Sequence, residues 1–369
     1  MRTTNSKMNI FVLATASRAS GALSIYLQFI EALSEQPATN HYYIFVDPSM
    51  PQPALPNVRY VAVDTRGARR VWFDFWGFKR IVKQINVVPQ IILSFQNTGV
   101  RYPQVPQTVY FHNILPLRGQ LWNPFKKATR TLFFYGSLYP HYIRLLINKR
   151  MNIVVQANFI KPMFVGKFKF SPERVHVIRP SIGKTELKEE FGASPFAPET
   201  FNLIYPASGF DYKNHQILVN ALDKLMRTEK EKAQQVVLHL TLERGENKPL
   251  EQRIAELGLT DNVLFHGQVP SSVLSTWYQH AHALVFPSWL ETLGLPLVEA
   301  ASYGLPIIAC DEAYAHEALD GYEGVEYVAK DDVTGWKNAI ERRCNMRIRY
   351  PLFKPEENNS WDILFNILQ

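Results

Sequence analysis

The sequence predicts an α/β protein with two domains, each built on a parallel sheet. The chain has 369 residues, 46% of them hydrophobic, which is enough to form two buried cores. Residues 283–309 combine a short apolar run, a polar turn, a helical stretch and a second apolar run, which is the pattern of one βαβ unit. Residues 180–198 hold glycines, prolines and charges, so we expect them to link the domains.

Short apolar runs bounded by turn residues predict strands, and apolar residues at helical spacing predict helices. The expected strands are residues 10–14, 42–46, 58–63, 91–94, 108–111, 153–155, 201–205, 236–242, 283–286 and 325–328, with a strand and turn over 263–269. The expected helices are residues 23–33, 72–85, 214 onward, 270–281, 296–301, 332–344 and the amphipathic 361–368. The run 153–155 is predicted to be the last strand of the first domain.

Two carboxylates frame the turn of the βαβ unit. Glu291 lies in the turn, and Glu299 comes eight residues later, about one turn into the helix. The backbone N–H groups of Gly294 and Leu295 suit a phosphate, because a helix N-terminus offers unpaired donors and a positive dipole end. Acids that accept sugar hydroxyls beside a phosphate suit a nucleotide-sugar. Spacing alone also allows a simpler interpretation, in which Glu291 is a solvated loop acid and Glu299 a surface helix acid.

The residues around this turn also match a longer pattern. Its parts are Pro287-Ser288, Glu291 and Glu299 with Gly294-Leu-Pro between them, Ala300, and Gly304-Leu-Pro-Ile-Ile. The pattern resembles the E-x7-E signature of GT4-family (glycosyltransferase group 1) retaining GT-B glycosyltransferases. The resemblance implies two Rossmann-like domains facing each other across a cleft, with a C-terminal helix crossing back to the first. It implies an N-terminal acceptor-side domain of residues 1–182 plus 350–369, and a donor-binding domain of residues 183–349.

In that family the first Glu contacts the transferred sugar and the second contacts the nucleotide ribose. The resemblance therefore implies those roles for Glu291 and Glu299. The family usually reads E-G-F-G-L-P, whereas this chain has Thr292 after the first Glu. Because the lost glycine leaves the backbone at Thr292 less free, we expect a different preference for the donor sugar.

A lysine just before a predicted helix offers a second anchor for a diphosphate. The family usually supplies an Arg and a Lys here. Lys213 matches the Lys, Ser208 stands at the Arg position, and Arg244 is our candidate for the replacement charge. Without a replacement, we expect weaker donor binding or lost activity, and Lys213 could equally be a solvated cap residue. The resemblance also implies that Gly267 and Val269 approach the nucleotide base.

Two residues of the first domain follow predicted strands. Gly21 lies between the first strand and the first helix, where a glycine lets a ligand come close or serves an ordinary turn. His112 directly follows the strand at 108–111, and a neutral imidazole there can hydrogen-bond a sugar hydroxyl. His112-Asn113 resembles the family's His-Asp, which implies contact with the transferred sugar. A histidine at a strand end is also often only a satisfied loop residue.

Positive charge is concentrated in the first domain. Between Asp74 and Glu173 there are fourteen Lys and Arg residues and no acid, so the rest of the +7 chain sums to −7. Residues 118–150 mix these cations with large aromatic residues, which favours an anionic membrane surface. We expect that membrane or acceptor face to include Arg118, Lys126, Lys127 and Arg130. One alternative is a core helix with a solvated basic face. The other is a nucleic-acid surface, which is disfavoured because the segment contains no recognition motif for nucleic acid.

The bulk composition excludes several classes of protein. Two cysteines provide no disulfide framework and fit a reducing compartment. No apolar run approaches the ~20 residues that span a bilayer, and the apolar start, 10–14, is shorter than a signal-peptide core, so we expect a first strand there. No second His or carboxylate stands at ligand spacing from His112, and no Asp-x-Asp occurs, so we expect neither a metal nor another cofactor.

The resemblance, together with these patterns, implies a retaining glycosyltransferase that moves a sugar from a nucleotide-sugar to a glycan or polyprenyl-type lipid-linked acceptor. We expect it in polysaccharide or lipopolysaccharide biosynthesis, in the cytoplasm and peripheral on the inner face of the plasma membrane, without nucleic acid as a partner. Three alternatives stay open. They are a GT-B nucleotide-sugar epimerase, a non-catalytic glycosyltransferase partner subunit, and a nucleic-acid binder, which would show steep salt dependence.

Overall fold

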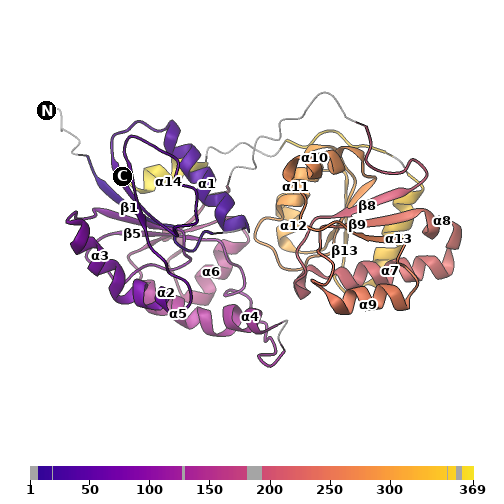
Figure 1. Cartoon of the computed structure of the whole chain (residues 1–369), viewed down its shortest axis with the longest axis horizontal. Coiled ribbons are helices and arrows are strands. Elements are labelled where there is room, and N and C mark those ends of the chain that lie inside the picture. Colours follow the sequence, from indigo (N-terminus) through magenta and orange to yellow (C-terminus); the bar gives the residue numbers. More distant parts are fainter. Residues whose placement is uncertain (1–6, 19, 127–128, 181–192, 347, 355–359) are drawn as a thin grey trace. The chain divides into compact units, whose positions relative to one another are not determined.

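The computed structural model in Figure 1 describes residues 7–18, 20–126, 129–180, 193–346, 348–354 and 360–369. The chain divides into two compact units, Met1–Ser181 with Glu357–Gln369, and Ile182–Glu356. The domain boundary predicted from the sequence, between residues 182 and 183, lies outside the described residues and stays a prediction. Lys127 and most of the expected linker lie outside the described residues.

The first unit is organised around a parallel sheet. Its described strands are β1 (Asn9–Leu13), β2 (His41–Val46), β3 (Val58–Ala62), β4 (Ile91–Ser94), β5 (Gln107–Phe111), β6 (Asn152–Val155) and β7 (Val175–Val177). The order is β3-β2-β1-β4-β5-β6-β7, and every neighbouring pair is parallel. The order reverses between β1 and β4. In open α/β sheets, ligands bind outside the carboxyl ends of the strands at such a reversal.

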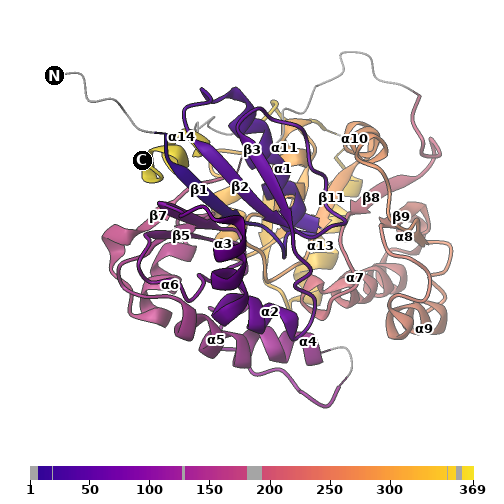
Figure 2. The same cartoon turned by 60° about the vertical axis from the view of Figure 1, so that its left-hand side comes forward.

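Helices cover both faces of this sheet (Figures 1 and 2). They are α1 (Ser20–Glu35), α2 (Arg69–Trp72), α3 (Phe78–Ile85), α4 (Arg130–Phe133), α5 (Tyr139–Leu146), α6 (Ile160–Phe168) and α14 (Ser360–Ile367). One core joins α1 and α14 to β1, β2 and β4, and the other lies between the sheet and the α3 side. Apolar side chains alternate between these cores because successive strand residues point to opposite faces.

The C-terminal helix packs into the first unit, as the sequence predicted. The Trp361 ring lies 6.0 Å from Phe29 and 6.1 Å from Tyr110, measured between centroids. The Phe365 ring lies 5.9 Å from Phe29, and Gln36 donates a hydrogen bond to Asp362 at 3.0 Å. The last helix therefore completes the core of the unit in which the chain begins.

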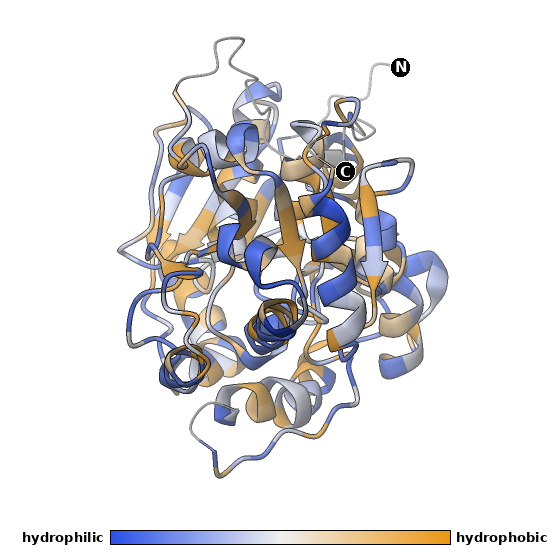
Figure 3. Ribbon diagram, turned by 90° about the vertical axis from the view of Figure 1, so that its right-hand side faces the viewer, coloured by the Kyte–Doolittle hydropathy of each residue, from blue (hydrophilic) through white to orange (hydrophobic). Residues whose placement is uncertain are grey.

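The second unit repeats the arrangement. Its described strands are β8 (Phe201–Tyr205), β9 (Val236–Leu240), β10 (Val263–Phe265), β11 (Ala283–Phe286), β12 (Ile307–Cys310) and β13 (Val325–Val328). The order is β10-β9-β8-β11-β12-β13, all parallel, and it reverses between β8 and β11. The helices are α7 (His215–Thr228), α8 (Lys230–Gln235), α9 (Lys248–Glu256), α10 (Ser271–His280), α11 (Leu295–Ser302), α12 (Ala313–Ala318) and α13 (Val333–Cys344). Figure 3 shows many apolar residues in the strands, whereas the helices carry both polar and apolar residues.

The structure corrects parts of the sequence prediction. The run 153–155 is not the last strand of the first unit, because β7 pairs with β6 beyond it. The helix expected over 72–85 is interrupted by a π-helical turn, η1 (Phe73–Gly77), and a second such turn, η2 (Phe134–Leu138), joins α4 to α5. Such turns add a residue to the helical repeat and are frequent near functional sites. Of the helices in the described part of the chain, none is long and apolar enough to cross a membrane.

Candidate active site

An ion pair lies at the reversal point of the second sheet. Lys213 follows β8 in a short 3-10 turn, η4 (Asp211–Lys213), and Glu291 follows β11. Lys213 Nζ donates a hydrogen bond to Glu291 Oε1, although 78 residues separate them. The two side chains are 14% and 17% exposed, so the pair is only partly open to water. Ser288 Oγ donates to the same carboxylate oxygen at 2.7 Å.

The backbone holds these two loops together. Trp289 N–H donates to the Tyr212 carbonyl at 3.1 Å, which ties the loop after β11 to the loop after β8. Tyr205 OH donates to the Lys213 carbonyl at 2.6 Å. The Lys213 amine also lies 5.5 Å from the centroid of the Tyr212 ring and 5.9 Å from that of Phe286. The Lys213 backbone is therefore held by Tyr205, and the Lys213 amine is held by the Glu291 carboxylate and by two aromatic rings.

The start of α11 offers unpaired backbone donors beside this pair. Gly294 precedes the helix with φ +63°, in the left-handed region, and a Cβ there would lie 3.1 Å from Tyr314. Within the described part of the chain, the N–H groups of Gly294 and Leu295 have no protein acceptor. Leu295 and Thr292 are half-buried. Unpaired donors at a helix start suit an anion, and the binding of a phosphate there stays a prediction. Glu291 is the acid nearest to this helix start in sequence.

Glu299 is held by a residue that the sequence did not single out. Tyr278, on α10, donates a hydrogen bond to Glu299 Oε2 at 2.8 Å. Burial raises the pKa of the Glu299 carboxyl, and the Tyr278 hydroxyl acts in the opposite direction. Glu299 is half-buried, so its second oxygen can accept a hydrogen bond from a ligand hydroxyl. Nothing in the spacing of the sequence links position 278 to position 299.

The remaining residues predicted for the donor lie in neighbouring loops. Ser208 is exposed after β8, and Val269 is half-buried. Gly267 has φ +70°, and a Cβ there would meet the Glu243 carboxylate at 2.5 Å, so the position requires glycine. Arg244 stacks over the Phe265 ring, with 5.5 Å between its guanidinium carbon and the centroid. That contact turns Arg244 toward β10, and its role as the replacement for the family's Arg stays a prediction.

In the first unit, His112 and Asn97 form a second polar site. Both follow strands that end at the same edge of the sheet, β5 and β4. The His112 backbone N–H donates to Asn97 Oδ1 at 2.7 Å, and Asn97 Nδ2 lies 3.2 Å from His112 Nε2. Since the backbone amide can only donate, the Asn97 oxygen must face it, and the Asn97 amide nitrogen must donate to Nε2. A neutral His112 therefore carries its proton on Nδ1.

The environment keeps His112 neutral. Burial, together with the positive charge of Arg70, lowers its pKa to about 4. Its Nδ1 atom is buried and has no hydrogen-bond partner among the residues that the structure describes. Asn97 adopts φ +60°, a left-handed conformation that asparagine tolerates better than most residues. The result is an oriented N–H donor at the sheet edge.

Gly21 lies in the first turn of α1, and a Cβ there would meet open space. No neighbouring protein atom therefore requires a glycine at this position, and its predicted approach to a ligand stays a prediction.

On the predicted basic face, Lys126 and Arg130 are exposed and Arg118 is half-buried. Leu121 and Phe125 beside them are 86% and 90% exposed.

Only the arrangement of potential ligand side chains in the structure bears on the predicted absence of a metal. Among the described residues, no group of three or more His, Cys, Asp or Glu side chains is placed to hold a metal ion. Cys310 is buried and Cys344 is half-buried.

Comparison with known proteins agrees with this geometry. Residues 187–350, which contain the donor-site residues of the second unit, match the family model described as glycosyl transferases group 1. The match covers less than half of the chain. The match agrees with the sequence-based recognition of that family, and the expected glycosyltransferase activity is taken up as a proposal below.

The chain has curated relatives and structural neighbours. It is 38% identical over 92 residues to the O-antigen chain mannosyltransferase RfbU of Salmonella typhimurium, a match that spans 25% of this chain and only 26% of that protein. The fold is shared with WaaG, a glycosyltransferase involved in lipopolysaccharide biosynthesis, at a TM-score of 0.67 and 14% identity over 92% of this chain and 91% of that one. The fold is also shared with Anabaena HepE in complex with UDP and glucose, at a TM-score of 0.60 and 14% identity over 91% of this chain and 89% of that one. The predicted GT-B fold is therefore confirmed, with a Rossmann-like sheet in each unit.

Proposed function

We propose that this chain is a retaining glycosyltransferase that transfers a sugar from a nucleoside-diphosphate sugar to a glycan or lipid-linked saccharide. The observation that carries the proposal is the Lys213–Glu291 pair, which lies beside unpaired amides at the reversal point of the second sheet. A cation and free amides suit a diphosphate, and a carboxylate that already accepts two hydrogen bonds suits sugar hydroxyls.

The leaving diphosphate gains negative charge as its bond to the sugar breaks. Lys213 and the N–H groups of Gly294 and Leu295 would stabilise that charge, and fixed donors of this kind commonly supply the largest catalytic term. This assignment gives the leaving group its stabilisation without a metal, as we expect. Arg244 would add a second cation only if its side chain left the Phe265 ring.

Three side chains would orient the donor. Glu291 accepts hydroxyls of the transferred sugar, and Ser288 fixes the direction of its carboxylate. Glu299 accepts the ribose hydroxyls through the oxygen that Tyr278 does not use. The resemblance of His112-Asn113 to the family's His-Asp implies that His112 contacts the transferred sugar. We assign no covalent nucleophile, so retention rests on the E-x7-E resemblance. Gly267 and Val269 would face the base.

The relatives indicate the class of donor and acceptor. HepE binds UDP and glucose, and RfbU acts on an O-antigen chain. The basic and apolar residues after β5 would bring the chain to an anionic membrane, where lipid-linked saccharides are found. We therefore place the protein in polysaccharide or lipopolysaccharide biosynthesis, in the cytoplasm and peripheral on the inner face of the plasma membrane.

The proposal is tested with the intact chain and a panel of nucleotide-sugars, with and without a mixture of saccharide acceptors and without added metal. We expect acceptor-dependent release of nucleoside diphosphate from one donor, and a product whose anomeric configuration by NMR equals that of the donor. Epimerisation or hydrolysis that needs no acceptor would replace the proposal with a nucleotide-sugar epimerase. Failure to bind any nucleotide-sugar would instead favour a non-catalytic partner subunit.

A further inference from the structure

The first unit contains a buried ion pair next to the loop that follows β4. Arg70, on α2, donates from Nε to Asp74 Oδ2 at 2.6 Å, and Asp74 lies in the π-helical turn η1. The Asp74 side chain is fully buried, and that of Arg70 is 16% exposed. Two charges removed from water to this degree need further hydrogen bonds, because the pair alone does not offset the loss of hydration. The residues that supply those bonds indicate what the pair holds in place.

The Arg70 guanidinium bonds the residues on both sides of Asn97. Arg70 Nη2 donates to the Gln96 carbonyl at 3.3 Å and to Thr98 Oγ1 at 2.8 Å. Gln96 and Thr98 are buried, so water does not compete for these bonds. A planar guanidinium that bonds three acceptors has little freedom to turn. Arg70 therefore fixes the backbone just before Asn97 and the side chain just after it.

Two tyrosines of α5 complete this network. Tyr142 OH donates to Asp74 Oδ2 at 2.6 Å, and Tyr139 OH donates to the Gln96 carbonyl at 3.1 Å. The two helices α2 and α5 lie side by side in Figures 1 and 2. Asp74 lies within η1, and Tyr139 directly follows η2. Turns of this kind are frequent at functional sites, and here they bring both helices to the loop after β4.

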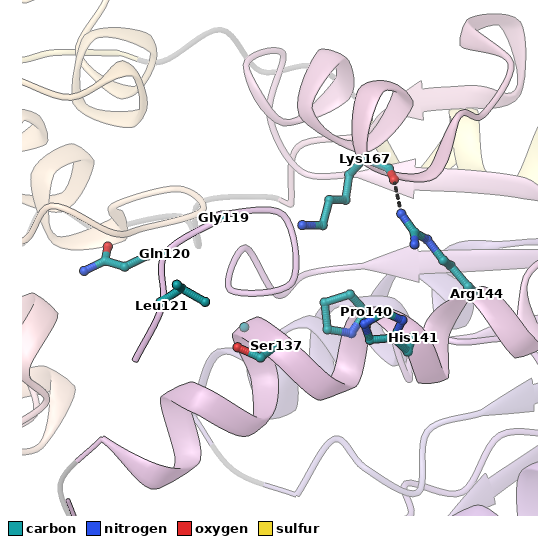
Figure 4. A pocket seen from close by; sticks show the side chains of 9 residues that line it. Gly119, Gln120, Leu121, Ser137, Pro140, His141, Arg144 and Lys167 are labelled. Atoms are coloured by element: carbon teal, nitrogen blue, oxygen red, sulfur yellow. Dashed lines mark hydrogen bonds between the residues drawn. The ribbon is translucent and has the colours of Figure 1, made fainter. Parts of the chain in front are cut away.

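The other side of α5 faces a different part of the unit. His141 and Arg144 lie two residues beyond Tyr139 and Tyr142, which is about half a turn around the helix. They line a cavity of about 260 Å³ between α5, η2, the loop after β5 and α6 (Figure 4). Arg144 Nη2 donates to the Lys167 carbonyl at 2.9 Å, as Figure 4 shows. Arg144 thus also holds a backbone carbonyl, but one far in sequence from Asn97, which makes it a matched control.

Asn97 connects the network to His112. Its side-chain oxygen accepts from the His112 backbone N–H at 2.7 Å, and its amide nitrogen lies 3.2 Å from His112 Nε2. Both contacts depend on the left-handed backbone of Asn97, at φ +60°, a conformation that needs support from its surroundings. The Arg70 bonds at the two neighbouring positions supply that support.

We propose that Arg70 is a positioning residue for His112, because its bonds on both sides of Asn97 fix the orientation and the tautomer of the His112 ring. Asp74 and Tyr142 hold the guanidinium where it reaches the loop. The use of this orientation in sugar transfer rests on the proposed function, since the contact of His112 with the transferred sugar belongs to it.

The test is nitrogen-15 NMR of the histidine rings in the intact chain at about pH 8, where a histidine of ordinary pKa is also neutral. The His112 signals are identified by their loss in His112→Gln. Arg70→Lys keeps the charge but loses the guanidinium fork, and Thr98→Val removes one of its acceptors. Since one hydrogen bond shifts an equilibrium by about two- to tenfold, each variant should lower the ratio of the Nδ1–H to the Nε2–H form at least about twofold. The control Arg144→Gln should leave the ratio unchanged.

Two results of this experiment overturn the proposal. One is an unchanged ratio in Arg70→Lys and Thr98→Val, with both variants folded in a thermal unfolding scan. The other is an equal change in Arg144→Gln, which would show a general effect on the unit. The measurement uses no nucleotide-sugar, so it decides the proposal even where no sugar transfer is found and the proposed function fails.

A kinetic measurement tests the role of Arg70 in the reaction. With a donor and an acceptor that the wild type uses, Arg70→Lys should lower kcat by about two- to tenfold. It should leave the affinity for the nucleoside diphosphate alone unchanged, because that ligand carries no sugar for His112 to contact. An unchanged kcat, or an equal loss of kcat and of diphosphate affinity, would contradict a role through His112.

Discussion

Replacing Glu291 by glutamine should tighten the binding of a nucleoside diphosphate that carries no sugar. In the structure the Lys213 amine is paired with the Glu291 carboxylate. A diphosphate seated on the α11 amides and on Lys213 must share that cation with the acid and lies close to its negative charge. The Glu291→Gln substitution would remove the charge and keep the hydrogen-bonding shape.

The size of the effect follows from Coulomb's law. Two unit charges about 7 Å apart, at an effective dielectric constant of about 20, interact by about 2 kcal/mol. The Glu291 side chain is 17% exposed, so solvent reduces the effect only partly. We expect a gain of about 1–2 kcal/mol, which corresponds to about 5- to 30-fold tighter binding.

The assay is isothermal titration calorimetry of the intact chain with UDP and with GDP, at low salt and without added metal. Glu323→Gln, at an exposed acid in the same unit, controls for the change in net charge. Lys213→Met should weaken diphosphate binding by itself, and Glu291→Gln should still tighten binding in that background, because the repulsion between the carboxylate and the diphosphate does not depend on Lys213. Unchanged or weaker diphosphate binding by Glu291→Gln would refute the account of the Lys213–Glu291 pair.

Three further predictions concern side chains whose contacts or burial the structure reveals. Tyr278→Phe removes the hydrogen bond to the half-buried Glu299, and should lower the free energy of unfolding by about 1–3 kcal/mol in denaturant titrations at neutral pH. Asn97→Ala should free the tautomer of His112, so that the nitrogen-15 NMR shifts of its ring indicate a mixture in place of the Nδ1–H form. His215, whose pKa burial lowers to about 3, should destabilise the protein by about 2 kcal/mol at pH 5, and His215→Leu should remove that loss.

The sign of the pH effect follows from proton binding. The unfolded state binds a proton at His215 below about pH 6.5, and the native state does so only below about pH 3. Stability is therefore complete above pH 6.5 and falls progressively as the pH drops toward 3. A His215→Leu variant whose stability falls with acid as steeply as that of the wild type would contradict this.

An equal effect of Tyr278→Phe in the presence and absence of Glu299→Gln would show that the two residues are not coupled.

The sequence could predict what local chemistry determines. The short apolar run at 283–286, the polar turn and Pro296 at the helix start together specify one βαβ unit, and the structure contains it. The helix after Lys213 and the C-terminal helix also followed from apolar spacing. The π-helical turns did not, because an extra residue in a helix leaves the apolar pattern almost unchanged.

Two residues of the site could be predicted to lie together because each follows a strand. Lys213 and Glu291 each follow a strand, and the reversal of strand order brings those two ends together. Tyr278 lies within a helix and meets Glu299 through packing, which no spacing encodes. Asn97 follows a predicted strand, so its place at the sheet edge was a signal that we could have used. Arg244 was chosen for its charge and for its place after the strand at 236–242, and its side chain stacks over Phe265.

The central claim is that the edge of the second sheet seats a sugar diphosphate through Lys213 and Glu299. Calorimetric titration of the intact chain with a panel of nucleotide-sugars, repeated with Lys213→Ala and Glu299→Ala, tests it most directly. We predict one-to-one binding of at least one donor without metal, weakened at least about tenfold by each substitution, since each removes a charged hydrogen-bonding group. Absence of any bound donor, or a donor affinity that neither substitution changes, would contradict the claim.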